Sequence, residues 1–239
     1  MLYLIGLGLN DEKDLTLKGV ETAKQCECFV ELYTSHWKGS VSNLEKIIGK
    51  QVIQLKRKDM EENLEELIKK AKEKDIAIFV PGDPLAATTH IELLILAKRM
   101  RIPFRIIHNA SIFSAVGESG LQLYKFGKTA SIPFTEQIEN VKETVAKNKK
   151  IGLHTLLLLD IDSEVELFMN VGNALKILLK NKVIKNTDRI IVLSRLGDEK
   201  PEIIYETVRW LIDRKFDTPS ALIIPGKFHF KEKEYLEIL

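Results

Sequence analysis

The chain has 239 residues, and its 36 basic and 34 acidic side chains leave a formal charge of +2, which gives no bulk electrostatic case for a nucleic-acid-binding protein. The length allows one large domain or two small ones. No apolar run reaches the roughly 18 residues of a membrane span, and the apolar N-terminal segment lacks the basic residues that flank a signal peptide. For these last two reasons we expect a cytoplasmic protein. Cys26 and Cys28 are too few and too close for a disulfide framework, and no second Cys or His pair has zinc spacing, so we expect reduced thiols and no metal site.

The N-terminal segment has part of a dinucleotide-binding pattern. A first strand is expected from Leu2 to Ile5, followed by Gly6-Leu7-Gly8-Leu9 and then a helix. Asp11, however, stands where the third glycine should be, and the acidic loop around it would repel a pyrophosphate. Glu31, at the end of a second expected strand from Cys28 to Leu32, does stand where a ribose-binding acid belongs. The acidic loop therefore opposes a dinucleotide site and Glu31 favours one.

The central segment is an apolar strand, Ile76 to Val80, that runs into the turn Pro81-Gly82-Asp83-Pro84. Five apolar residues after a charged helical segment are typical of a parallel strand buried on both faces. The prolines fix φ and Gly82 supplies conformational freedom, so Asp83 is held at the carboxyl end of the strand, where ligands bind in open α/β sheets.

The other elements expected in the first half alternate between helix and strand, which is typical of a parallel α/β sheet. They are a helix Ser42 to Ile48, a strand Val52 to Leu55, an amphipathic helix Met60 to Lys74, a helix Thr88 to Met100, a strand Phe104 to Ile107 and a tight helix Ser114 to Gly120.

The second half predicts a separate α/β domain, because glycines at 117, 120 and 127 interrupt the regular pattern. We expect an N-terminal domain over residues 1–115 with a largely parallel sheet, and a C-terminal domain over 116–239 with a mixed sheet. The expected strands are Thr129 to Ile132, His154 to Leu159, Ile190 to Leu193 and Ala221 to Ile224, and the expected helices are Thr135 to Asn148, one through Leu175 to Leu179, and Tyr205 to Ile212.

Several segments, in order along nearly the whole chain, match one family. They are Tyr3 to Leu9, Pro81-Gly82-Asp83-Pro84-Leu85, Ala87-Thr88-Thr89-His90, Ser111-Ile112, Ser114 to Gly117, Tyr124-Lys125-Phe126-Gly127-Lys128, His154 to Leu157, Leu159-Asp160 and Pro225-Gly226-Lys227. With these segments the chain resembles the diphthine synthase family, in the tetrapyrrole methylase-like class of S-adenosylmethionine-dependent methyltransferases. The Ala-Thr-Thr-His and Tyr-Lys-Phe-Gly-Lys segments point to this family in particular.

The resemblance implies an enzyme that methylates the amino group of a modified histidine on translation elongation factor 2 during diphthamide biosynthesis, with trimethylation in archaeal members. It also implies a homodimer that binds S-adenosylmethionine in a cleft between the two domains. The cofactor contacts that it implies are Leu9, Asp83, Ala86, Ser111, Ile112, Leu159, Leu196 and Ser220. Core packing is the alternative interpretation of Leu159 and Ile112.

The chemistry requires a neutral amine and a dry, aligned site, so we expect no catalytic triad and assign no catalytic residue. Asp160, Asp162 or a water near Asp83 are candidate general bases. Lys125 or Lys128 could pair with the carboxylate beside the substrate amine, and Tyr124 or Asp160 could tolerate the methylated cation. Two alternatives stay open: a methyltransferase for tetrapyrroles, and a nucleotide-binding α/β module without catalysis.

Overall fold

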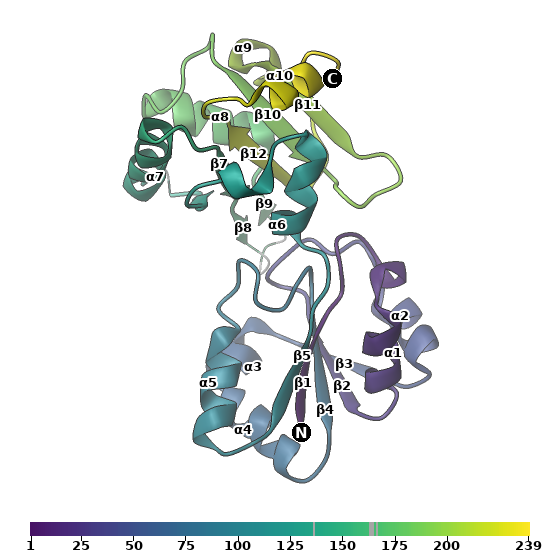
Figure 1. The fold of residues 1–239 in the computed structure, drawn as a ribbon. Coiled ribbons are helices and arrows are strands. Elements are labelled where there is room, and N and C mark those ends of the chain that lie inside the picture. The colour runs from purple at the N-terminus through teal and green to yellow at the C-terminus, as the bar shows by residue number, and fades with distance from the viewer. Residues whose placement is uncertain (136, 163–164, 166) are drawn as a thin grey trace. The chain divides into compact units, whose positions relative to one another are not determined.

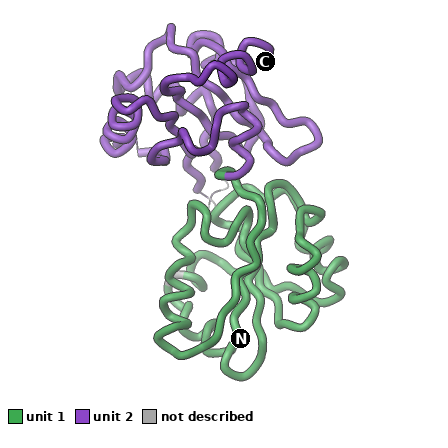
Figure 2. Tube along the Cα trace, viewed as in Figure 1, with its two compact units in different colours: residues 1–113 green, residues 114–239 purple. Residues whose placement is uncertain are grey.

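The computed structural model describes residues 1–135, 137–162, 165 and 167–239. It divides into two compact units, residues 1–113 and 114–239 (Figure 2). Each unit contains its own five-stranded sheet with helices packed on it (Figure 1). The expected α/β class is confirmed.

The sheet of the first unit is parallel throughout, in the order β3-β2-β4-β1-β5. Its strands are β1 (Leu2–Gly6), β2 (Glu27–Glu31), β3 (Val52–Leu55), β4 (Ile76–Val80) and β5 (Phe104–Ile107). All five residues of β4 are buried, because alternate side chains enter cores on opposite faces of the sheet. Ile76, Ile78 and Val80 join one core, whereas Ala77 and Phe79 join the other.

Helices cover both faces of this sheet (Figure 1). On one side lie α1 (Leu17–Ala23) and α2 (Val41–Ile48), and on the other lie α3 (Arg57–Glu61), α4 (Leu64–Lys69) and α5 (Ile91–Arg99), with 3-10 turns η1 (Glu12–Asp14) and η2 (Lys70–Lys72).

The single helix expected from Met60 to Lys74 is wrong, because this segment is broken into α3, α4 and η2. Asn63 leaves the helical conformation, with φ −107° and ψ 15°, and its carbonyl accepts from the N–H of Leu67. Asparagine competes well for such turn positions. The break lets Met60 and Leu67 both reach the core, so packing overrides the continuous amphipathic pattern.

The sheet of the second unit is mixed, as expected, in the order β11-β10-β12-β7-β6. Only β6 and β7 are parallel neighbours in it. Its strands are β6 (Ala130–Ile132), β7 (Thr155–Leu159), β10 (Arg189–Ser194), β11 (Glu202–Thr207) and β12 (Ser220–Ile224), and a separate hairpin pairs β8 (Ile161–Asp162) with β9 (Leu167–Phe168).

The helical elements after residue 111 are α6 (Ile112–Ala115), η3 (Val116–Ser119), η4 (Leu123–Lys125), α7 (Glu139–Lys150), α8 (Val171–Lys180), α9 (Val208–Leu211) and α10 (Phe230–Leu236). The helix expected from Thr135 begins at Glu139, and Glu136 lies outside the described residues.

The helix expected from Tyr205 to Ile212 is wrong in its first part. Residues up to Thr207 form β11, with Tyr205 opposite Ile191 of β10, and α9 begins only at Val208. The Arg189 guanidinium lies 4.1 Å from the centre of the Tyr205 ring across the strand pair. The neighbouring strand therefore supplies contacts that the local sequence pattern does not reveal.

Candidate functional site

Three loops of the first unit follow adjacent strands at the carboxyl edge of its sheet. They are Gly6 to Leu9 after β1, Pro81 to Ala86 after β4, and His108 to Ile112 after β5. Parallel strands place such loops together, and this edge is where ligands bind in open α/β sheets. Five residues predicted as cofactor contacts lie in these loops: Leu9, Asp83, Ala86, Ser111 and Ile112.

The first two loops are joined by a glycine pair. The N–H of Gly82 donates to the carbonyl of Gly8 at 2.8 Å, and the N–H of Gly8 donates back at 3.2 Å. Both have positive φ, 85° for Gly8 and 69° for Gly82. A Cβ on Gly6 would lie 2.5 Å from the Gly82 carbonyl oxygen, so only glycine allows this approach. The Gly-Leu-Gly and Pro-Gly-Asp-Pro segments thus form one structural unit.

Asn109 links the third loop to the first, a role that we did not predict from the sequence. Its amide nitrogen donates to the carbonyls of Gly6 at 3.0 Å and Asp14 at 2.9 Å. The available signal was a side-chain amide directly after a buried strand, a position from which it can bridge neighbouring strand ends.

Asp83 is oriented by both neighbouring loops. Its Oδ1 accepts from the N–H of Leu85 at 3.0 Å, and its Oδ2 accepts from the N–H of Asn109 at 3.2 Å. The same Oδ2 lies 2.7 Å from Nδ1 of His108. The Asp83 side chain is 14% exposed, whereas that of His108 is 67% exposed. The result is a fixed carboxylate with an accessible imidazole beside it, and sequence reasoning missed the imidazole.

The acidic residues of the first loop have internal structural partners. Asp14 accepts from the N–H of Asn10 at 2.7 Å, and Glu12 accepts from the side chain of Asn43 at 2.9 Å. Burial acts to raise the pKa of Glu12, but the hydrogen bonds that its carboxylate accepts, including those from Ser40 and Asn43, outweigh burial and lower the pKa. The loop therefore keeps its negative charge next to the Gly6 to Leu9 turn.

Glu31 does not face a ribose site, because its side chain is fully buried. Its carboxylate accepts from the hydroxyl of Thr34 at 2.6 Å and from two backbone N–H groups, and it lies 3.6 Å from Nε2 of His90. Burial raises the pKa of Glu31 to about 7 and lowers the pKa of His90. The acidic residue at the end of the second strand, which favoured a dinucleotide site, thus has a structural role in the core.

The three contacts predicted in the second unit also gather at one sheet edge. Ser220 opens β12 opposite Ser194 of β10, and the register of β12 on β7 puts it beside Leu159. Leu196 is buried in the turn that follows β10. Leu159 is half-buried and packs against the hydrophobic core, which fits the core-packing interpretation as well.

Lys125 is committed to a buried ion pair in the second unit. Its Nζ contacts Oε2 of Glu232 on α10 and donates to the carbonyl of Lys227 at 2.8 Å. The expectation that Lys125 pairs with a substrate carboxylate is therefore wrong. Lys128 instead contacts the Asn140 side chain at 3.4 Å, and Tyr124 is exposed.

Asp160 also has a structural role. Its Oδ2 accepts from the N–H of Phe134 at 3.0 Å and its Oδ1 from the N–H of Ile161 at 3.0 Å. Both oxygens hold backbone groups, which makes Asp160 a poor general base. Asp162 is exposed on the β8–β9 hairpin.

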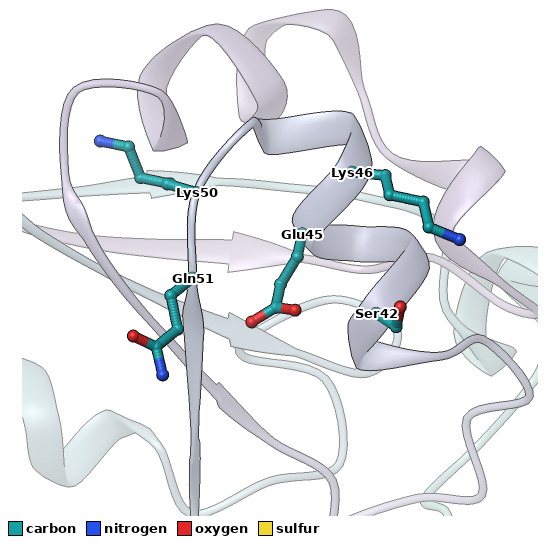
Figure 3. Close-up of a pocket in the computed structure, with 5 residues that line it drawn as sticks. All are labelled: Ser42, Glu45, Lys46, Lys50 and Gln51. Atoms are coloured by element: carbon teal, nitrogen blue, oxygen red, sulfur yellow. The ribbon is translucent and has the colours of Figure 1, made fainter.

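An open polar depression lies beside α2 (Figure 3), lined by Ser42, Glu45, Lys46, Lys50 and Gln51. It adjoins the segment that leads into the start of β3. The depression is therefore at the amino-terminal edge of the sheet, opposite the edge that carries the three loops. Glu45 accepts from the N–H of Val52 at 2.9 Å and Lys50 donates to the Cys26 carbonyl at 3.0 Å. These groups stabilise the local fold, and we assign no function to the depression.

The described residues contain no group of three or more His, Cys, Asp or Glu side chains that could hold a metal ion. Within the same residues, no helix is long and apolar enough to cross a membrane.

Comparison with known proteins gives one consistent picture. The family model of tetrapyrrole (corrin/porphyrin) methylases matches residues 1–211. The diphthine synthase of Methanocaldococcus jannaschii is 44% identical, over 100% of this chain and 98% of that protein. The diphthine methyl ester synthase of Dictyostelium discoideum is 41% identical, over 99% and 97%. A crystal structure of a diphthine synthase superimposes with a TM-score of 0.93 at 35% identity, covering 99% of this chain and 94% of that one.

Proposed function

The chain belongs to the tetrapyrrole (corrin/porphyrin) methylase family, and we propose that it acts in this family as a diphthine synthase. It is an S-adenosylmethionine-dependent N-methyltransferase that methylates the amino group of a modified histidine on translation elongation factor 2. The observation that carries the proposal is the 44% identity to a diphthine synthase over the full length of the chain. The working form is a cytoplasmic homodimer.

The residues of the first unit fit the cofactor, which is a cation at its sulfonium and carries an ammonium group. Asp83 is a mostly buried carboxylate already oriented by Leu85 and Asn109, so it offers a fixed acceptor for an ammonium or hydroxyl donor. The neighbouring acidic loop favours a cation and opposes a pyrophosphate. We assign the cofactor to the contacts Leu9, Asp83, Ala86, Ser111, Ile112, Leu159, Leu196 and Ser220.

The bound S-adenosylmethionine would supply an electrophilic methyl group, and the protein's task is to place the acceptor nitrogen in line with it. The joined Gly8 and Gly82 turns fix the backbone groups around Leu9 and Asp83, so their geometry is set before the ligand arrives. The apolar side chains of Leu159 and Leu196 supply van der Waals contact and exclude water.

A tetrapyrrole methyltransferase and a non-catalytic nucleotide-binding module are both less well supported. The high full-length identities are to proteins named for diphthine chemistry, and the acidic loop with buried Glu31 offers little to a nucleotide phosphate or ribose. We propose three methyl groups on the amine as the product. The name of the Dictyostelium relative specifies a methyl ester as product. The number of methyl groups transferred is therefore measured separately from the identity of the substrate.

The experiment is a competition between acceptors for methyl-labelled S-adenosylmethionine. One acceptor is elongation factor 2 from cells that stop before this methylation, and the other is a tetrapyrrole precursor. Label on the factor supports the proposal, whereas label only on the tetrapyrrole contradicts it. A change in melting temperature with S-adenosylhomocysteine, compared with NAD, tests the cofactor separately.

A further inference from the structure

The pair of His108 and Asp83 has the arrangement of an oriented base at the edge of the predicted cofactor site. Nδ1 of His108 lies 2.7 Å from Oδ2 of Asp83, and the imidazole is 67% exposed. Because a carboxylate is an acceptor, Nδ1 carries the proton and Nε2 is the unprotonated, accepting nitrogen of the neutral ring. Among the described residues, no side chain is within hydrogen-bonding distance of Nε2.

The pair is held by more than its own contact. Asp83 also accepts from the backbone N–H groups of Leu85 and Asn109, so the carboxylate cannot turn away without losing three hydrogen bonds. The Asn109 side chain in turn fixes the end of β5 to Gly6 and Asp14. An imidazole that takes up a proton at Nε2 therefore keeps its Nδ1 contact with a carboxylate that is itself fixed in place.

Other charged groups on the packed elements have different partners. The carboxylate of Asp14 accepts from the N–H of Asn10, and Glu12 is bonded to Ser40 and Asn43. Asp83 is the one charged side chain, within the described part of the chain, that contacts the His108 ring.

The proposed reaction releases protons that need an acceptor. An aliphatic amine is mostly protonated at neutral pH and has no lone pair for attack. Before each transfer the ammonium must lose one proton; its nitrogen then forms a bond to the methyl carbon as the carbon–sulfur bond breaks, leaving S-adenosylhomocysteine neutral and the nitrogen positive again. Three transfers therefore release three protons and end with a fixed cation.

We propose that His108 is the group that takes the proton from the substrate ammonium, at Nε2, with Asp83 holding the imidazole ring in position through Nδ1. The inference rests on the proposed function, because it needs an amine acceptor beside the cofactor. His108 contacts Asp83, a predicted cofactor contact, and precedes another, Ser111, by three residues in the same loop; its exposed ring can meet a side chain from another protein. The proton then passes to solvent before the next transfer.

The test uses the intact enzyme and elongation factor 2 that lacks these methyl groups, under single-turnover conditions. In His108→Asn the side-chain amide can still donate to Asp83 from nearly the position of Nδ1, but the accepting nitrogen is gone. We expect its transfer rate at pH 7 to fall about 100-fold, the usual contribution of a positioned base, while the Kd for S-adenosylhomocysteine stays within twofold of wild type. Arg105→Gln, an exposed change on β5, the strand that leads into His108, is the matched control and should keep the wild-type rate.

The pH profile separates proton transfer from a structural role. The deficit of His108→Asn should shrink as pH rises toward the range where the amine loses its proton unaided. A variant with the wild-type rate at pH 7, or with the same deficit at every pH, overturns the role of His108. A wild-type enzyme that methylates no elongation factor 2 overturns the proposed function itself, and the role of His108 with it.

Discussion

His154, directly before β7, donates from Nε2 to Oε1 of Glu232 at 3.2 Å, and this pair joins the start of β7 to α10 across 78 residues of sequence. The tautomer follows from the other ring nitrogen, because Nδ1 accepts from the N–H of Gly226 at 2.9 Å. Lys125, Gln122 and His229 donate to the same carboxylate. The Tyr-Lys-Phe-Gly-Lys segment thus anchors the C-terminal helix, which explains why Lys125 is not available to a substrate.

Replacing Glu232 by Gln should destabilise the protein by about 3 kcal/mol at pH 7. Burial acts to raise the pKa of Glu232, but hydrogen bonds from Lys125 and its neighbours outweigh it and lower the pKa to about 2. A lowered pKa stabilises the fold above the unfolded value near 4.5, and this contribution is lost as pH falls toward 2. Urea unfolding from pH 7 downward measures the difference. Glu237→Gln, at the exposed position directly after α10, should change the free energy of unfolding by less than about 0.5 kcal/mol. Equal losses of stability in the two variants would contradict the account.

Replacing Glu31 by Gln should change how stability depends on pH. Burial raises the pKa of Glu31 to about 7, so the folded state binds its proton more tightly than the unfolded chain does. That contribution is present below the unfolded value of 4.5 and is lost as pH rises through about 7. Relative to wild type, Glu31→Gln should therefore gain roughly 2 to 3 kcal/mol between pH 4.5 and pH 8. Unfolding at several pH values checks this, with exposed Glu21→Gln as control; parallel wild-type and Glu31→Gln curves would refute it.

Replacing Gly6 by Ala should damage the cofactor site, because its Cβ would meet the Gly82 carbonyl at 2.5 Å and push the joined turns apart. We expect the Kd for S-adenosylhomocysteine to rise more than tenfold, measured by calorimetry. Gly49→Ala is the control, since it has φ 79° with nothing within 4 Å of the added carbon. It should lose about 1 to 2 kcal/mol of stability through backbone strain and keep its affinity. Equal affinities for both variants would show that the glycine pair does not shape the site.

Replacing Asp83 by Ala should weaken binding of S-adenosylhomocysteine by about 1 to 3 kcal/mol if its carboxylate accepts from the ligand. Asp83→Asn keeps an oxygen for the Leu85 N–H but loses the charge, so it separates turn shape from charge. Calorimetry gives the affinities, and circular dichroism shows whether each variant is folded. An unchanged affinity in the folded Ala variant would mean that Asp83 only shapes the turn.

The sequence predicted those elements whose pattern is local. The apolar run Ile76 to Val80 and the Pro-Gly-Asp-Pro turn are found where expected, and the alternation of helices and strands correctly predicted the first sheet. β11 was missed because its partner is β10, and the break at Asn63 was missed because core packing decides it.

The features of the candidate site also fall into those that the sequence predicts and those that it does not. The predicted residues Asp83 and Ser111 could be placed at strand ends from the sequence alone. The Gly8 to Gly82 hydrogen bonds, the Asn109 bridge and the His108 contact with Asp83 could not, because each joins segments that are distant in sequence. The same limit applies to Lys125, whose partner Glu232 is 107 residues away.

The central claim is most directly tested by mass spectrometry of elongation factor 2 before and after incubation with the enzyme and S-adenosylmethionine. The factor is taken from cells that stop before this methylation, and a variant lacking the modified histidine is treated in parallel. The account predicts three added methyl groups on the amino nitrogen of the modified histidine and none on the variant. No mass gain on the factor, or methyl groups that persist after the histidine is replaced, would contradict it.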